Sequence, residues 1–176
     1  MSASDWFTHS RFGLFLHWGL YSIPARAEWL KTIDKLPDEV YDTYFHEFNP
    51  TRYDPHAWAA AAKHAGMKYA VLTTKHHEGF CLFDSKHTQY TSMHTPAKRD
   101  LVREYVAAFR AAGLKIGFYH SLLDWHHPHY TIDRHHPLRD LPPDHPERKN
   151  RHLPTYIDYL HAQVRELLTN YGKIDI

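Results

Sequence analysis

Residues 100–121, DLVREYVAAFRAAGLKIGFYHS, place an amphipathic helix directly before a continuous apolar strand. Asp100 is a typical N-cap residue, and Gly113 supplies the left-handed conformation in which many helices end. The predicted helix has a single apolar face, formed by Leu101, Val102, Tyr105, Val106, Phe109 and Ala112. Because the strand that follows is apolar along its length, it is expected to be buried on both faces, as in a parallel sheet.

The order of helix, glycine, lysine and apolar strand occurs in two further segments. Residues 54–74, DPHAWAAAAKHAGMKYAVLTT, contain Asp54 as the N-cap and Gly66 at the end of the helix. Residues 154–176 contain a third amphipathic helix, followed by the start of a strand at 174–176. A repeated pair of helix and strand is typical of a parallel α/β fold.

Two more elements precede these repeats, a strand at 12–17 and a helix at 38–47. The chain thus contains roughly four strand–helix units, whereas a complete (β/α)8 barrel takes about 250 residues. The sequence therefore predicts an α/β fold with a parallel sheet, organised as a partial TIM-like (β/α)8 barrel, about half of one. We expect a single truncated barrel domain over residues 1–176.

Composition and charge exclude several classes of function. With 21 basic and 20 acidic side chains the net charge is +1, so the chain lacks the basic field that nucleic acids bind. Its one cysteine, Cys81, forms no intrachain disulfide, which fits a reducing compartment. Residues 1–13 hold no apolar signal segment, and no apolar run reaches the roughly 18 residues that cross a bilayer. We expect a cytoplasmic protein without nucleic-acid or membrane partners.

Polar side chains follow three predicted strands at the point where each strand ends. They are His17 after the first strand, His76, His77 and Glu78 after the second, and Tyr119, His120 and Asp124 at or after the third. The carboxyl ends of parallel strands are where ligands bind in α/β sheets and barrels. A single histidine in such a place is more often a structural residue, but three strands that end this way favour a binding site.

Two chemistries fit a site that is rich in histidine. One is a metal centre, since histidine is the commonest transition-metal ligand, but barrel metallohydrolases typically have two histidines on the first strand and this chain has only His17. His76 and His77 are also adjacent, which would turn their side chains to opposite sides of a strand unless a turn gathers them. The other chemistry is a hydrogen-bonding site for a polyhydroxylated ligand, with tryptophan walls. No cofactor is expected in that case.

Four motifs resemble a known enzyme family in sequence and in order. They are RFGLFLHWGLYSIPA at 11–25, EW at 28–29, TTKHHEGF at 73–80 and GLKIGFYHSLLDW at 113–125. Together they closely resemble the α-L-fucosidases of glycoside hydrolase family 29. The resemblance implies a (β/α)8-like catalytic barrel that cleaves terminal α-L-fucose from a fucosylated glycan or α-L-fucoside with retention of configuration. It also implies which residues bind the sugar: His17, Glu28, His76, His77 and Tyr119 on the fucose hydroxyls, with Trp29 lining the pocket.

The sequence departs from the family pattern at its end. In the family the fourth strand leads into a Trp-x-Asp segment whose aspartate is the nucleophile, and a glutamate acid/base follows further on. This chain reaches Asp175 and Ile176 at that point. A retaining glycosidase needs two carboxyl groups about 5–5.5 Å apart. Asp124 and Glu28 are the substitute candidates for catalysis, with Glu78 as a further carboxylate nearby.

Three hypotheses follow for the function. The first is an α-L-fucosidase whose site is completed by assembly or by a substitute carboxylate, the second a fucose-binding half-barrel without turnover, and the third a histidine-ligated metal-dependent hydrolase. Half a barrel leaves parallel edges open at 12–17 and 174–176, and such edges pair with other chains. We therefore also expect a homo-oligomer.

Overall fold

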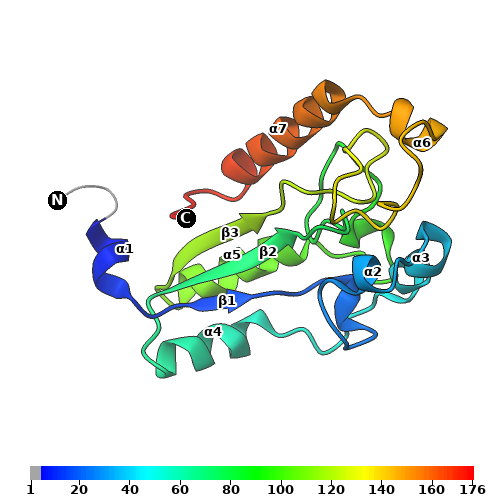
Figure 1. Cartoon of the computed structure of the whole chain (residues 1–176). Helices are drawn as coiled ribbons and strands as arrows, with labels where there is room; N and C mark the ends of the chain where they lie inside the picture. Colours follow the sequence, from blue (N-terminus) through cyan, green and yellow to red (C-terminus); the bar gives the residue numbers. More distant parts are fainter. Residues whose placement is uncertain (1–4) are drawn as a thin grey trace.

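The computed structural model describes residues 5–176 as a three-stranded parallel sheet packed against helices (Figure 1). The strands are β1 (Leu14–Leu16), β2 (Tyr69–Lys75) and β3 (Lys115–His120), in the spatial order β1-β2-β3. The other elements are α1 (Asp5–Ser10), η1 (Leu20–Ser22), α2 (Leu30–Ile33), α3 (Asp38–Glu47), α4 (Pro55–His64), η2 (Ser92–His94), α5 (Leu101–Ala111), α6 (Pro146–Lys149) and α7 (Leu153–Asn170).

All three strands run in the same direction, so their carboxyl ends lie at one edge of the sheet. In the register, Leu14 lies opposite Ala70, and Tyr69 lies opposite Lys115. The pairing of β2 with β3 becomes irregular between Thr73 and Lys75. Helices α2, α3 and α6 lie near the carboxyl ends of the strands, toward which the strand arrows point (Figure 1).

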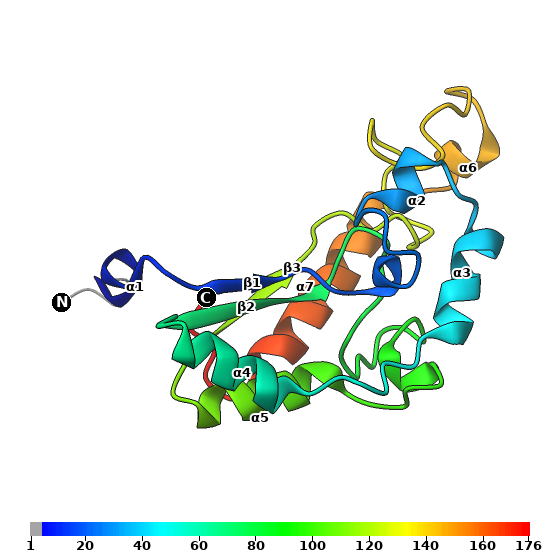
Figure 2. The ribbon, with the colours of Figure 1, turned by 90° about the horizontal axis from the view of Figure 1, so that it is seen from below.

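One face of the sheet is covered by α4 and α5, as Figure 2 shows from below. The side chains of this layer form the main core, which includes Leu72 of β2 and Tyr105 and Phe109 of α5, all fully buried. The hydroxyl of Tyr105 donates to the backbone oxygen of Ala70 at 2.7 Å, so the helix is also tied to the sheet by a buried hydrogen bond. This face is the one that the apolar helix stripes predicted.

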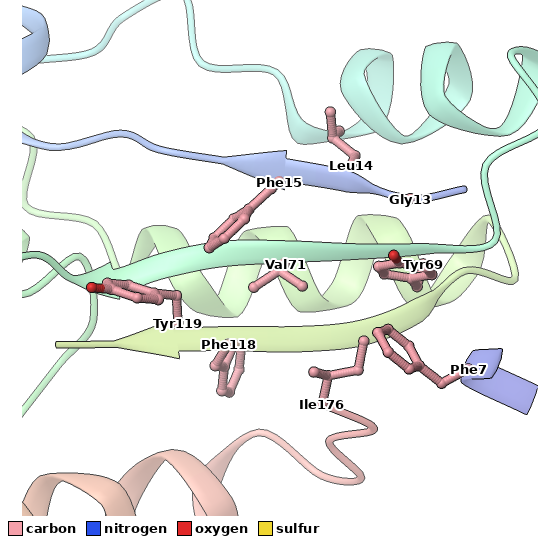
Figure 3. A pocket seen from close by; sticks show the side chains of 9 residues that line it. All are labelled: Phe7, Gly13, Leu14, Phe15, Tyr69, Val71, Phe118, Tyr119 and Ile176. Carbon is pink, nitrogen blue, oxygen red and sulfur yellow. The ribbon is translucent and has the colours of Figure 1, made fainter. Parts of the chain in front are cut away.

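The opposite face of the sheet is open and apolar. A depression of 360 Å³ lies there, and Figure 3 shows its lining side chains projecting from all three strands. Phe15 of β1 is 52% exposed on this face, and Phe7 and Ile176 border the depression at 45% and 42%. Large apolar side chains are therefore in contact with solvent where the sheet has no second layer.

The prediction of a fourth strand at 174–176 is wrong for this structure. The segment lies beside β3, where Asp175 N and Ile176 N donate to Ile116 O at 2.8 and 3.2 Å and Phe118 N donates to Ile176 O at 3.0 Å. The carboxylate of Asp175 also accepts from Ile116 N at 3.1 Å. The backbone bonds thus pair the segment with β3 in the parallel sense, although 174–176 does not form a regular strand.

The first strand is shorter than predicted, at Leu14–Leu16 rather than 12–17. A strand with a neighbour on only one side loses its ladder bonds early, and β1 pairs only with β2. The coarse prediction of an α/β fold with a parallel sheet is confirmed, and the helix predicted at 38–47 matches α3. The first four residues of the domain predicted at 1–176 lie outside the described residues.

The long connection between β3 and α7 contains a second apolar cluster. Trp125 and Tyr130 of the connection pack against Tyr156 and Leu160 of α7, and all four side chains are buried. The hydroxyl of Tyr156 in α7 also donates to the backbone oxygen of Leu122 in the connection at 2.8 Å. The connection is thus fixed to α7 by both apolar contacts and a hydrogen bond.

The predicted helix caps are confirmed. Asp54 accepts from Ala57 N and Asp100 accepts from Arg103 N, each at 2.9 Å. Gly66 and Gly113 follow the two helices with φ angles of +86° and +76°, the left-handed conformation that ends a helix at low cost for glycine.

Replacing Asp54 tests how much the cap contributes. Asp54→Ala removes the acceptor for Ala57 N, and we expect the free energy of unfolding to fall by about 1 kcal/mol. Asp54→Asn keeps an oxygen at the same place and serves as the matched control. Urea unfolding followed by tryptophan fluorescence measures both variants, and equal losses in the two would contradict the assignment.

Candidate functional site

The structure brings His17, His76, His77 and Tyr119 together at the carboxyl ends of the three strands. The ring centroids of His17 and His76 lie 5.6 Å apart, and those of His76 and His77 lie 4.2 Å apart. The ring of Tyr119 is 5.8 Å from His17 and 6.0 Å from His76. We refer to these four side chains as the histidine cluster. The sequence placed them on one edge, and here they form one contiguous surface.

His76 and His77 do not point to opposite sides of a strand, as their adjacency predicted. β2 ends at Lys75, after the register irregularity, and the two histidines belong to the turn that follows. Gly79 closes this turn with a φ angle of +87°. Because the strand has ended, both rings turn toward the same site.

His17 is held by β2 rather than by its own strand. The backbone N of Trp18 donates to the hydroxyl of Thr73 at 3.0 Å, and that hydroxyl donates to Trp18 O, also at 3.0 Å. These two bonds fix the backbone directly after His17. The imidazole itself is exposed. Burial of its inner side and the neighbouring His76 lower the pKa of His17, while Glu28 raises it in part.

The orientation of His77 follows from its hydrogen bonds. Its Nδ1 lies 2.6 Å from the hydroxyl of Ser121, and that hydroxyl donates its proton to Leu123 O at 2.7 Å. Ser121 therefore accepts from His77, which places the imidazole proton on Nδ1 and leaves a lone pair on Nε2. Burial and the neighbouring His76 and His135 lower the pKa of His77 to about 4, so the ring is neutral at pH 7.

Aromatic side chains form the walls beside the histidine cluster. Trp29 packs against His77 with centroids 4.9 Å apart, and its ring also contacts Trp125 at 5.6 Å. Tyr21 contacts His76 at 5.2 Å. Burial raises the pKa of Tyr119, so its phenol keeps its proton. The site thus offers hydrogen-bond donors and acceptors between flat aromatic rings, which suits a ligand with many hydroxyl groups.

The three nearby carboxylates have very different surroundings. Glu28 is exposed, and its charge partly raises the pKa of His17. Glu78 is 1% exposed, with its Oε2 3.4 Å from Nδ1 of His76. Asp124 is also 1% exposed, and its Oδ2 lies 3.0 Å from the ammonium of Lys75. Of the two substitute catalytic candidates, Glu28 is therefore accessible to a ligand, and Asp124 is engaged in a buried ion pair.

Neither a metal centre nor a thiol nucleophile has support in the geometry. Within residues 5–176 there is no group of three or more His, Cys, Asp or Glu side chains placed to hold a metal ion. Cys81 is fully buried, and burial raises the pKa of its thiol to about 12. At pH 7 this thiol is protonated and out of reach of solvent, as expected for a packed side chain.

Comparison with known proteins identifies the family. The α-L-fucosidase family model matches residues 1–176. The chain belongs to the α-L-fucosidase family. The tissue alpha-L-fucosidase of Mus musculus is 38% identical over 143 residues, which cover 72% of this chain and 32% of that protein. The chain thus spans about a third of the length of this relative.

Solved structures of α-L-fucosidases share the fold. Alpha-L-fucosidase isoenzyme 1 from Paenibacillus thiaminolyticus superposes with a TM-score of 0.93 at 59% identity, over 98% of this chain and 41% of that one. An α-L-fucosidase from Bacteroides thetaiotaomicron, trapped as a covalent intermediate with 2-fluoro-fucosyl fluoride, gives a TM-score of 0.85 at 37% identity, over 98% and 39%. The motifs singled out in the sequence therefore lie within a region of shared fold.

Sequence reasoning missed several residues that shape this candidate site. Ser121 orients His77, and Tyr21 packs on His76, yet neither was singled out. Lys75 was read only as part of a motif, although a lysine at the end of an apolar strand needs a buried partner. That need is the signal that would have paired it with Asp124. The position of His135 against the Trp29 ring, at 5.4 Å, had no signal in the sequence.

Gly79 is required both by its backbone and by its neighbours. A Cβ there would lie 2.4 Å from Asp124 Oδ1 and 2.8 Å from the Cβ of His126, while a Cβ on Gly66 would meet nothing within 4 Å. Both glycines have nearly the same φ. Gly66→Ala should therefore lose about 1–2 kcal/mol from backbone strain alone, and Gly79→Ala should lose clearly more. Denaturant unfolding of the two variants compares them directly, and equal losses would rule out the proposed contact with Asp124.

Proposed function

We propose that this chain binds terminal α-L-fucose of a fucosylated glycan or α-L-fucoside at the histidine cluster, as part of a retaining α-L-fucosidase. Membership of the family supports the sugar, and the Bacteroides relative trapped with a fucosyl fluoride supports the covalent mechanism. The observation that carries the proposal is the meeting of His17, His76, His77 and Tyr119 at one edge of the sheet, with the Trp29 ring beside them. Uncharged imidazoles and a phenol both donate and accept hydrogen bonds, as a sugar with several hydroxyl groups requires.

Glu28 and Trp29 complete the proposed binding site. Glu28 is an exposed carboxylate beside His17, which suits it to accept from a sugar hydroxyl. Trp29 presents its ring next to His77, where the apolar side of a sugar ring can stack. His17, Glu28, Trp29, His76, His77 and Tyr119 are thus the proposed substrate-binding residues.

Hydrolysis with retention needs two carboxyl groups with separate tasks. One attacks the anomeric carbon to form a glycosyl-enzyme, and the other protonates the leaving oxygen and then activates water. Glu28 is the proposed substitute for one of these two carboxyl groups in this chain, because Asp124 is held by Lys75 away from solvent. Release of 4-nitrophenol from 4-nitrophenyl α-L-fucoside tests turnover, and loss of that release in Glu28→Gln tests the assignment. Fucose binding without release would support the alternative of a non-catalytic fucose-binding protein.

The binding residues are tested by calorimetry with fucose. His17→Ala, His76→Ala and His77→Ala each remove a hydrogen-bonding group from a buried polar contact, and each should cost roughly 1–3 kcal/mol, about 5- to 150-fold in affinity. His64→Ala, on the exposed side of α4, is the matched control and should bind as the unchanged chain does. Unchanged affinity in all three cluster variants would refute the site.

We also propose that the sheet is about half of a TIM-like barrel and that copies of the chain associate through its open face. The exposed Phe15 and Ile176 beside the 360 Å³ depression support this, because soluble proteins rarely leave a large apolar face in water. The free edge of β1 supports it too. A cytoplasmic location stays a prediction from composition. Among residues 5–176 no helix has both the length and the apolar character to cross a membrane.

Sedimentation velocity tests the association. The chain should sediment as a dimer or larger species at micromolar concentration, and Ile176→Lys, which places a charge at the border of the depression, should shift it toward the monomer. Asp158→Lys, a charge change on the exposed side of α7, is the control and should leave the distribution unchanged. A monomer across the whole concentration range would contradict the proposal.

A further inference from the structure

A buried ion pair lies directly behind the histidine cluster, and the proposed chemistry does not use it. The ammonium of Lys75 lies 3.0 Å from Asp124 Oδ2, and the two side chains are 0% and 2% exposed. Burial raises the pKa of Asp124, but the charge and hydrogen bond of Lys75 outweigh this effect and bring the pKa below its ordinary value. A buried pair is weak evidence for stability by itself, because both charges lose their water. The other contacts of Lys75 and Asp124 show which segments the pair joins.

Asp124 joins the segment after β3 to the turn after β2. Its Oδ1 accepts from the backbone N of His126 and His127 at 3.2 and 2.9 Å, so the carboxylate caps its own segment while Oδ2 binds Lys75. The backbone N of Trp125, the next residue, donates to His77 O at 2.8 Å. The two segments are therefore bonded both at the ion pair and beside it.

The same junction holds the side chain of His77. Ser121 N donates to Lys75 O at 3.0 Å, and the Ser121 hydroxyl accepts from Nδ1 of His77. Trp125 packs against the His77 ring with centroids 5.3 Å apart. The hydrogen-bond partner of the His77 ring and this flat neighbour both come from the segment that Asp124 anchors.

Lys75 is held from a third direction by α7. Its ammonium donates to Gln163 Oε1 at 3.0 Å and lies 5.7 and 5.1 Å from the ring centroids of Tyr156 and Tyr159. Gln163 is fully buried, and its Nε2 donates to the sulfur of Cys81 at 3.2 Å. Three segments that are far apart in the sequence thus meet at one ammonium group.

We propose that the Lys75–Asp124 pair is a positioning device for sugar recognition, which sets the segment 121–127 against the turn 76–79 and thereby aims Nε2 of His77 at the ligand. The proposal deepens the proposed function and rests on it. Without the charge on Asp124, the segment shifts, Ser121 leaves Nδ1, and the His77 ring loses the contact that fixes its tautomer and its direction. Asp124 is a positioning residue in this scheme and not a catalytic one.

Asp124→Asn tests the proposal with little change in shape. The amide keeps an oxygen for the backbone N of His126 and His127 but carries no charge for Lys75. Tyr105→Phe is the matched control, because it also removes a buried hydrogen bond to the strands but lies in the main core. Two quantities are measured below the unfolding temperature of every variant, the fucose affinity by calorimetry and the ring ¹⁵N signals of His77 by NMR.

We expect Asp124→Asn to bind fucose at least ten-fold more weakly and to lose the signal pattern of an Nδ1-protonated His77. Tyr105→Phe should lower the unfolding temperature while both quantities stay unchanged. If Asp124→Asn does not fold, the double variant Lys75→Met/Asp124→Asn, which leaves no unpaired charge, is judged by the same two measurements. A folded variant with unchanged His77 signals and unchanged affinity would overturn the proposal and leave the pair a structural contact only.

The His77 signals also separate this proposal from the proposed function. If the unchanged chain does not bind fucose, the proposed function fails, and the ligand-free NMR comparison still decides about the ion pair. Altered His77 signals in Asp124→Asn then support positioning, and unaltered signals refute it. If fucose binds equally well to both chains while the signals change, the aim of His77 does not matter for affinity and the proposal also fails.

Discussion

The parallel direction of the three strands is the constraint on which the rest of the structure depends. Because β1, β2 and β3 all end at one edge, the residues that follow them meet there without any long excursion of the chain. His17 follows β1, His76 and His77 follow β2, and Tyr119 is the second-last residue of β3. An antiparallel neighbour would have sent one of these groups to the far edge. The histidine cluster and the ion pair behind it are both consequences of this arrangement.

The charges of the site are divided between two layers. At the proposed binding site lie the rings of His77, His17 and Tyr119, where burial lowers the pKa of the two histidines and raises that of the tyrosine. Behind them lies the charged pair of Lys75 and Asp124, which is closed off from water. This order would keep strong fields away from the uncharged sugar that we propose as the ligand, while the ion pair would align the loops. Two further carboxylates lie near these rings: Glu28, which is exposed, and Glu78, which is buried with its Oε2 3.4 Å from Nδ1 of His76.

How much was predictable from sequence depended on whether the deciding interaction was local. The caps at Asp54 and Asp100 and the left-handed glycines follow from neighbouring residues, so α4 and α5 were placed within a residue or two, whereas the short helices α1, α2 and α6 were not predicted. The segment 174–176 pairs with β3 but forms no regular strand, and the side-chain bond of Asp175 to Ile116 N is one that no local pattern reveals. The gathering of His76 and His77 likewise depends on a register irregularity against β3.

The candidate site shows the same limit. Residue types at the strand ends indicated the cluster, and the family resemblance implied their roles. The sequence does not show which side chains are buried. Asp124 was therefore taken for an accessible carboxylate at the strand ends, although it is buried and pairs with Lys75. The bond of His77 to Ser121 joins residues 44 positions apart, and such pairs are set by tertiary packing.

The short first strand adds an energetic consequence. β1 has three residues and a single neighbour, so it should separate from the sheet at a lower free energy than β2, which is paired on both sides. His17 directly follows this strand, and therefore a ligand that binds its imidazole at this site binds only the form in which β1 is paired with β2. Occupancy of the site and pairing of β1 with β2 are then linked equilibria. The proposed ligand stabilises the paired β1 by mass action, and part of its intrinsic binding free energy is spent on keeping β1 paired.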